Sequence, residues 1–166
     1  MAIVRHDDAA GAVRAVRSSG KRVVTFVGFS AGGYEDPAAV EAAMRECLAR
    51  FDPARAAVCA GATPDGVGAV YPLARSLGFE TLGIVSSVAE KEGVAFSPDA
   101  DVVHVVKDDA WGGMHDGRLS PTSTAMVEAS DEIIAIGGGD IARAEAKAAR
   151  EAGLVVTEVP ARGGRK

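Results

Sequence analysis

The sequence contains few cysteines and no long apolar segment. Its two cysteines, Cys47 and Cys59, have neither the spacing of a metal site nor the number that a disulfide framework needs, so we expect two buried thiols and no metal. The amino-terminal stretch carries charges within its first eight residues and has no apolar run long enough for a signal peptide or a bilayer span. We therefore expect a cytoplasmic protein without a membrane partner.

An excess of basic residues is also missing. The 18 Lys and Arg residues are outnumbered by 23 Asp and Glu residues, and the net charge of −5 argues against nucleic acid as a partner. The 166 residues, 48% hydrophobic and 25% charged, have the composition of an ordinary globular chain, and we expect a single domain over residues 1–166. The composition indicates no particular cofactor, so the cofactor stays unknown.

Short apolar runs alternate along the chain with helical patterns, which predicts parallel strands joined by crossover helices. Because the apolar runs are almost continuous, we expect helices on both faces of a mainly parallel sheet, a three-layer, doubly wound α/β fold. Asp36 before Pro37, and Ser120 before Pro121, are typical of helix starts. The expected strands lie within 22–30, 55–63, 80–87, 99–108, 131–139 and 154–160, and the expected helices within 8–18, 36–51, 65–78, 120–130 and 141–152.

Three of the expected strand ends are rich in glycine. The segments are VGFSAGG (27–33), CAGATPDGVG (59–68) and IGGGD (136–140). In doubly wound sheets the ligand binds at the carboxyl ends of the strands, where glycines let the backbone approach it and helix N-termini favour an anion. The turns predict a phosphate-bearing or nucleotide-like ligand, with tight turning alone as the alternative. The candidate ligand-binding residues in these turns are Gly28, Ser30, Gly32, Gly61, Thr63, Gly138 and Gly139.

Two common nucleotide-binding motifs do not fit these turns. The first turn lacks the G-x-G-x-x-G spacing of a dehydrogenase, and the second strand ends without an acidic residue. A P-loop needs a lysine and a hydroxyl after its last glycine, but Gly33 is followed by Tyr34 and Glu35. The sequence therefore disfavours both classes.

A resemblance to a known superfamily is carried by VVTFVGFSAGGYEDPAAVEAAMRECLA, AAVCAGATPDGVGAVYPLARSLGFETLGIVS and TAMVEASDEIIAIGGGDIARAEAKAAREAG. These stretches resemble the Rossmann-like superfamily of the cytokinin-activating phosphoribohydrolases, often labelled lysine decarboxylases, with related nucleotide-sensing domains and molybdenum-cofactor carriers. The resemblance spans about residues 22–159. It implies a Rossmann-like fold whose glycine turns hold a nucleoside monophosphate.

The match to the superfamily's motifs is partial. The residues that match its S-D pair, its paired glycines and its glutamate are Ser130, Asp131, Gly138, Gly139 and Glu145. Ile141 and Ala142 replace the Gly and Thr of the P-G-G-x-G-T-x-x-E motif. In MHDGR (114–118), Gly117 replaces the arginine of the M-H-E-R-K motif. These departures leave hydrolysis of a nucleoside monophosphate open.

Asp140 follows the third glycine turn and is placed to cap the helix after it. A carboxylate there would repel a phosphate, so we expect a sugar hydroxyl near Asp140 and an anion near Ser30 or Thr63. Capping alone is the alternative role of Asp140.

The polar segment KDDAWGGMHDGRLSPTST (107–124) contains the single tryptophan. Loops of this length inside compact domains are often functional. Trp111 is a candidate for stacking on a base, His115 for proton transfer and Arg118 for pairing with a phosphate, and Thr122 belongs to a hydroxyl cluster. A subunit contact for Trp111 and solvated side chains for the others are the alternatives.

Glu145 is the remaining catalytic candidate, as a base or a ribose ligand, with a surface pair to Arg143 or Lys147 as its alternative. Together these features predict that a nucleotide-like or phosphorylated small ligand binds at the carboxyl edge of the sheet. The expected reaction, if the chain is an enzyme, is cleavage or transfer at an N-glycosidic bond. The alternative is a non-catalytic sensor or carrier, and in either case we expect a homodimer or a larger homo-oligomer.

Overall fold

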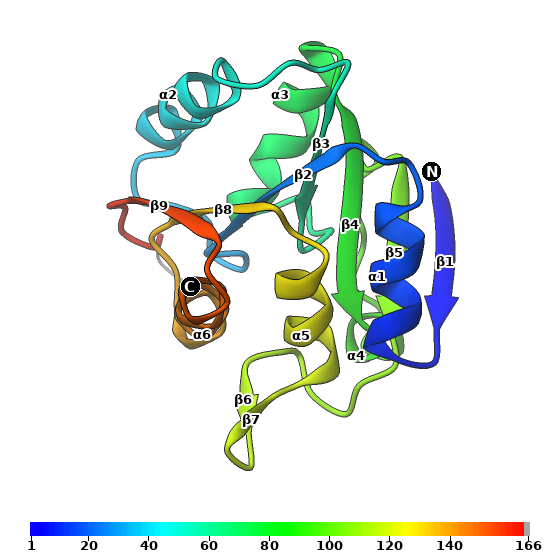
Figure 1. Ribbon diagram of the computed structural model, residues 1–166. Helices are drawn as coiled ribbons and strands as arrows, with labels where there is room; N and C mark the ends of the chain where they lie inside the picture. The colour runs from blue at the N-terminus through cyan, green and yellow to red at the C-terminus, as the bar shows by residue number, and fades with distance from the viewer. Residues whose placement is uncertain (165–166) are drawn as a thin grey trace.

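The computed structural model describes residues 1–164 and contains a seven-stranded sheet with helices on both faces (Figure 1). The last two residues of the expected domain lie outside the described residues. The strands of the sheet are β1 (Ala2–His6), β2 (Arg22–Gly28), β3 (Ala56–Ala60), β4 (Glu80–Ser86), β5 (Val102–Val106), β8 (Glu132–Ile136) and β9 (Val155–Val159). The helices are α1 (Ala9–Arg17), α2 (Pro37–Leu48), α3 (Val70–Ser76), α4 (Ser87–Lys91), α5 (Pro121–Glu128) and α6 (Asp140–Glu151). A separate hairpin is formed by β6 (Met114–His115) and β7 (Arg118–Leu119).

The strands lie in the order β1-β5-β4-β3-β2-β8-β9, and all neighbours are parallel. From β2 the chain winds outward through β3, β4 and β5, and it then crosses to the other side of β2 to form β8 and β9. The winding therefore reverses between β2 and β8, where Gly28 lies opposite Ile136. At such a switch point a crevice opens at the carboxyl edge of the sheet.

Each face of the sheet has its own apolar core. Helices α2, α3 and α4 cover one face around Phe26, Met44 and Tyr71, and helices α1, α5 and α6 cover the other around Met126 and Ile133 (Figure 1). This arrangement confirms the expected three-layer, doubly wound α/β fold. None of the helices in residues 1–164 is both long enough and apolar enough to cross a membrane.

The expected helix starts are confirmed by their caps. The side chain of Asp36 accepts a hydrogen bond from Ala39 N at 3.1 Å, and Pro37 occupies the first helical position, where no N–H is needed. Ser120 caps α5 in the same way, with Pro121 behind it. These local signals place α2 and α5 correctly.

Three elements differ from the expectation. The helix expected over 65–78 begins as a 3-10 turn at Gly66–Ala69, and α3 follows at Val70. Pro72 lacks the N–H that would bond back to the carbonyl of Gly68, which favours this break. Strand β1 and helix α4 were not expected, because each has only five residues and β1 is an edge strand with little burial.

Candidate functional site

A cavity with a volume of about 710 Å³ lies at the carboxyl edge of the sheet. Its walls come from the loops after β2 and β3, the end of β4, the segment after α4, and helices α5 and α6. Seven of the candidate residues line it: Gly28, Ser30, Gly61, Thr63, Trp111, Thr122 and Glu145. The structure thus brings the first two glycine turns together with one buried carboxyl group.

The first glycine turn is fixed to the neighbouring strand by Tyr34. Its hydroxyl donates a hydrogen bond to the carbonyl of Ile136 at 2.7 Å and accepts one from Phe29 N at 3.3 Å. A Cβ at Gly28 would collide with that hydroxyl and lie 2.6 Å from the Ile136 carbonyl, and a Cβ at Gly138 would lie 2.5 Å from Cβ of Ala142. Packing at the switch point therefore already requires glycine at positions 28 and 138.

The second glycine turn is held by Tyr71 in the same manner. The Tyr71 hydroxyl donates to the carbonyl of Leu82 at 2.8 Å and accepts from Ala62 N at 3.0 Å. A Cβ built on Gly61 meets no atom within 4 Å, and Gly61 lines the cavity. Gly61 is thus the glycine whose missing side chain leaves room for a ligand.

Glu145 is buried and lines the cavity, with 5% of its surface exposed. Burial raises the pKa of its carboxyl to about 7, against a smaller lowering by the hydrogen bond that Ser123 Oγ donates to Oε2 at 2.9 Å. The surface pairs considered from the sequence are wrong, because Arg143 pairs with Asp140 and Lys147 with Glu151. The carboxyl can hold a proton near neutral pH and exchange it with a bound molecule.

The segment between β5 and α5 is tied down at its base by Asp108. One oxygen of this carboxylate accepts from Ala110 N at 3.0 Å, and the other accepts from Thr122 N at 3.0 Å and Thr122 Oγ1 at 2.7 Å. Burial alone would raise the pKa of Asp108, but these hydrogen bonds outweigh it and hold the pKa below its ordinary value. Trp111 follows this anchor, half-exposed, at the wall of the cavity.

His115 and Arg118 lie in the hairpin beyond Trp111, which projects away from the sheet (Figure 1). Both side chains are exposed, and neither lines the cavity. His115 Nε2 lies 3.2 Å from the carbonyl of Gly112. The structure therefore does not bring these two candidates to Glu145.

The remaining candidates, Gly32, Gly138, Gly139 and Asp140, lie outside the cavity lining. The expected cap by Asp140 is wrong: α6 starts at Asp140, Gly139 is its N-cap, and no side chain caps it. The Asp140 side chain is 98% exposed and pairs with Arg143. The glycine at the N-cap lets the helix begin one residue early, so Asp140 turns outward.

Several lining residues were missed from the sequence. They are mainly the apolar residues Val67, Ile84, Val85, Val94, Met126 and Ile141. The position of Ile84 and Val85 at the end of an expected strand was an available signal. A second signal was the i, i+3, i+4, i+7 spacing of Ala142, Glu145, Ala146 and Ala149, which places Glu145 in the buried stripe of α6. Ser123, the partner of Glu145, had no signal in the sequence.

The electrostatics of the cavity are acidic. Among the described residues that line it, Asp65 and Glu145 are ionisable acids, and none is Lys, Arg or His. Residues 1–164 contain no cluster of three His, Cys, Asp or Glu side chains able to hold a metal ion. The cavity therefore offers hydroxyls, backbone groups and a carboxyl to a ligand, surrounded by apolar walls.

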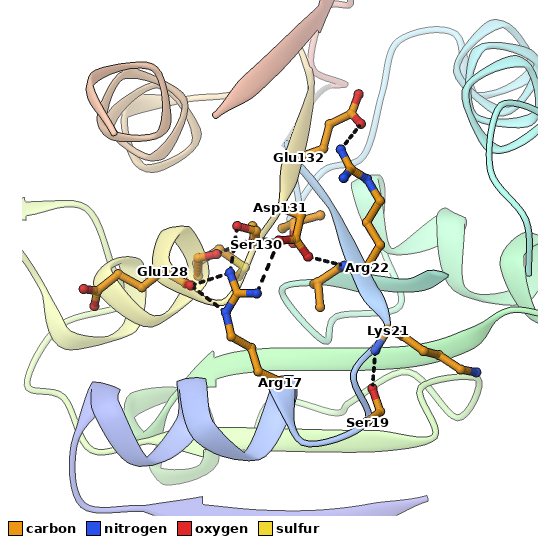
Figure 2. A network of polar contacts seen from close by, with 11 residues as sticks. Arg17, Ser19, Lys21, Arg22, Glu128, Ser130, Asp131 and Glu132 are labelled. Atoms are coloured by element: carbon orange, nitrogen blue, oxygen red, sulfur yellow. Dashed lines mark hydrogen bonds and ion pairs between the residues drawn. The ribbon is translucent and has the colours of Figure 1, made fainter. Parts of the chain in front are cut away.

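The opposite edge of the sheet contains a separate polar network, shown in Figure 2. Asp131 accepts a hydrogen bond from Val23 N at 2.8 Å and pairs with Arg17 at 3.3 Å. Ser130 Oγ lies 2.6 Å from Thr25 Oγ1. The S-D pair that matches the superfamily thus holds the start of β8 against β2, far from the cavity edge.

Comparison with known proteins supports the fold. No protein-family model matches the chain, and no curated protein matches its sequence. Two structures of the molybdenum cofactor carrier protein from Chlamydomonas reinhardtii match 83% and 84% of this chain and 76% of their own, with 18% identity and a TM-score of 0.59. The structural genomics target TM1055 matches 81% of this chain and 72% of its own, with 24% identity and a TM-score of 0.56. These likenesses confirm the Rossmann-like fold.

Proposed function

We propose that the chain binds a small nucleotide-like molecule in the cavity at the carboxyl edge and serves as a binding or carrier protein. The observation on which this rests is the cavity itself, which lies at the expected edge and contains a buried carboxyl but no cationic side chain among the described lining residues. Its volume of about 710 Å³ falls in the range of small-molecule sites. A carrier needs a cavity of this kind and no catalytic step.

The two glycine turns suit the sugar or phosphate end of such a ligand. Ser30 and Thr63 supply hydroxyls and neighbouring backbone amides, and Gly61 leaves the space for close approach. The apolar walls at Ile84 and Met126, with Trp111 at the side, suit a planar ring. The Chlamydomonas protein, a molybdenum cofactor carrier with a similar fold, supports a carrier function.

Cleavage at an N-glycosidic bond is the second candidate, and Glu145 favours it. A carboxyl that stays protonated near neutral pH is able to protonate a leaving base. The positions of His115 and Arg118 outside the cavity count against it, because phosphoribohydrolase chemistry would then depend on Glu145 alone.

Isothermal titration of a panel of nucleosides and nucleoside monophosphates tests the proposal. We expect at least one member to bind, and Gly61→Val to weaken its binding at least about tenfold, because the new side chain would enter the cavity. The control is Ala54→Val, at an exposed site before β3 on the opposite edge. Absence of binding across the panel at millimolar concentration, or equal binding by Gly61→Val, would overturn it. If the parent protein releases free base from a nucleoside monophosphate and the Glu145→Gln variant does not, the hydrolase function would replace the carrier function.

A further inference from the structure

One oxygen of the buried Glu145 carboxyl has no partner in the protein. Oε2 accepts the hydrogen bond from Ser123, whereas Oε1 accepts none from the described residues. Glu145 lines the cavity, and its unpartnered Oε1 is not fully enclosed by protein atoms. Oε1 therefore stays open to a molecule in the cavity.

Ser123 determines which oxygen is left open. It is fully buried, and its Oγ accepts a hydrogen bond from Gly113 N at 2.7 Å. The Ser123 hydroxyl donates its proton to Glu145 Oε2, 2.9 Å away. Ser123 is thus a positioning residue, which fixes the carboxyl and leaves Oε1 as the acceptor for a ligand.

The surroundings of Glu145 favour a ligand that donates hydrogen bonds. No cation is among the described lining residues, and Asp65 is a second acid in the lining. Met126 and Ile141 make the neighbouring wall apolar, so a carboxylate there lacks the solvation that donors from a ligand would restore. Two adjacent N–H groups on a planar ring supply such donors and also fit between apolar walls.

We propose that Glu145 is the specificity-determining residue of the cavity and accepts hydrogen bonds from the N–H edge of a planar heterocycle with an amino group beside a ring N–H. This inference rests on the proposed binding function and assigns the class of ring that the site prefers. A 2-amino-4-oxo pyrimidine ring, as in guanine, has this edge, and its two adjacent N–H groups can both donate to the single open oxygen Oε1, which has two lone pairs. Removing the amino group leaves a single N–H, and an adenine edge places an acceptor beside its amino group.

A proton must leave Glu145 when such a ring binds. Burial raises the pKa of the free carboxyl to about 7, so at about pH 6 it holds a proton, and N–H donors favour the ionised form. The proton passes to the buffer. The neighbouring titratable groups do not take it: burial raises the pKa of the Cys59 thiol on β3 to about 12, and Arg143 and Lys147 each pair with an acidic neighbour on α6.

The test is titration calorimetry with guanosine and inosine, which differ only by the amino group, at about pH 6 in two buffers of different protonation enthalpy. We expect guanosine to bind at least about tenfold more tightly than inosine and to release nearly one proton per ligand. Glu145→Gln should lose both the preference and the proton release while its unfolding temperature stays at or above that of the parent. Glu151→Gln, an exposed change on the same helix, is the matched control and should keep both.

Ser123 is tested by the pH dependence of guanosine affinity. Ser123→Ala removes a hydrogen bond that lowers the pKa of Glu145, so the pH at which affinity rises should move upward, and Ser123→Thr should restore it. A purely structural role for Ser123 would change stability and leave this pH unmoved.

The outcomes separate the two proposals. Equal binding of guanosine and inosine, or binding without proton release, overturns the role of Glu145. In that case the proposed binding function of the cavity still stands if Gly61→Val weakens the binding. If other members of the panel bind but guanosine and inosine do not, the proposed role of Glu145 is also overturned. Failure of the whole panel overturns both.

Discussion

Replacing Glu145 with glutamine should stabilise the protein at alkaline pH and leave its stability much less changed in acid. The folded carboxyl has its pKa raised from 4.5 to about 7, mainly by burial. The native state therefore keeps a proton that the unfolded chain has already lost, and the free energy of unfolding falls as the pH rises through this window. Well above pH 7 the buried carboxylate is ionised and destabilises the folded parent chain, whereas the glutamine variant has no charge at this position.

The difference between these two pKa values corresponds to about 3 kcal/mol. The folded parent chain loses most of this stabilisation between about pH 5 and about pH 8.5. The stability advantage of Glu145→Gln over the parent chain should therefore grow by about 2.5 kcal/mol across that interval. The hydrogen bond from Ser123 survives in the variant through the amide oxygen, so the comparison isolates the charge.

Urea unfolding of both proteins at several pH values measures this difference. Other groups titrate equally in the two chains and cancel. Glu151→Gln, at an exposed site on the same helix, serves as the control and should show a nearly constant difference from the parent. A pH-independent advantage of Glu145→Gln would show that the carboxyl is solvated in the folded state, which would refute the argument.

Three further predictions follow from the structure. Trp111→Ala should weaken ligand binding by about 1–3 kcal/mol if the ring stacks on the bound base, and ligand should change the Trp111 fluorescence of the parent; unchanged values in both assays would place Trp111 outside the site. Asp108→Ala should lower the unfolding free energy by about 1–3 kcal/mol and speed proteolysis of residues 109–119, because three hydrogen bonds to its carboxylate are lost; an unchanged digestion rate would contradict the anchor. The homodimer expected from the sequence stays a prediction, and light scattering that gives the monomer mass across a wide concentration range would rule it out.

The layers and the edge at which the cavity lies were predictable because they depend on local signals. Asp36 with Pro37, and the glycine-rich strand ends, act within a few residues of themselves, and parallel strands bring their carboxyl ends to one edge. The sequence could not show which glycine faces free space. Gly28 and Gly61 look alike in the chain, and only the position of Tyr34 against Gly28 separates a packing role from a ligand-facing one.

The catalytic candidates were harder to place, because their positions depend on long-range contacts. The path of His115 and Arg118 follows from the hydrogen bonds between Asp108 and Thr122, residues fourteen positions apart, which send the hairpin away from the cavity. The orientation of α6 about its axis buries Glu145. The buried stripe of this helix is recognisable in the sequence only if Glu145 is included with the alanines Ala142, Ala146 and Ala149. Charged residues are usually assigned to the surface, so the sequence named Glu145 as a candidate without showing that its carboxyl is buried.

Strand β1 has a consequence for synthesis of the chain on the ribosome. Its partner is β5, with Ala2 opposite Val102, so β1 cannot find its place until β5 has been made. At roughly 5–20 residues per second, this delay lasts roughly 5–20 seconds. Strands β2, β3 and β4 can assemble in order during that time, whereas the segment with Ile3 and Val4 waits unpaired and open to chaperones. Strand β1 is therefore added to the sheet only after β2, β3, β4 and β5 have been made.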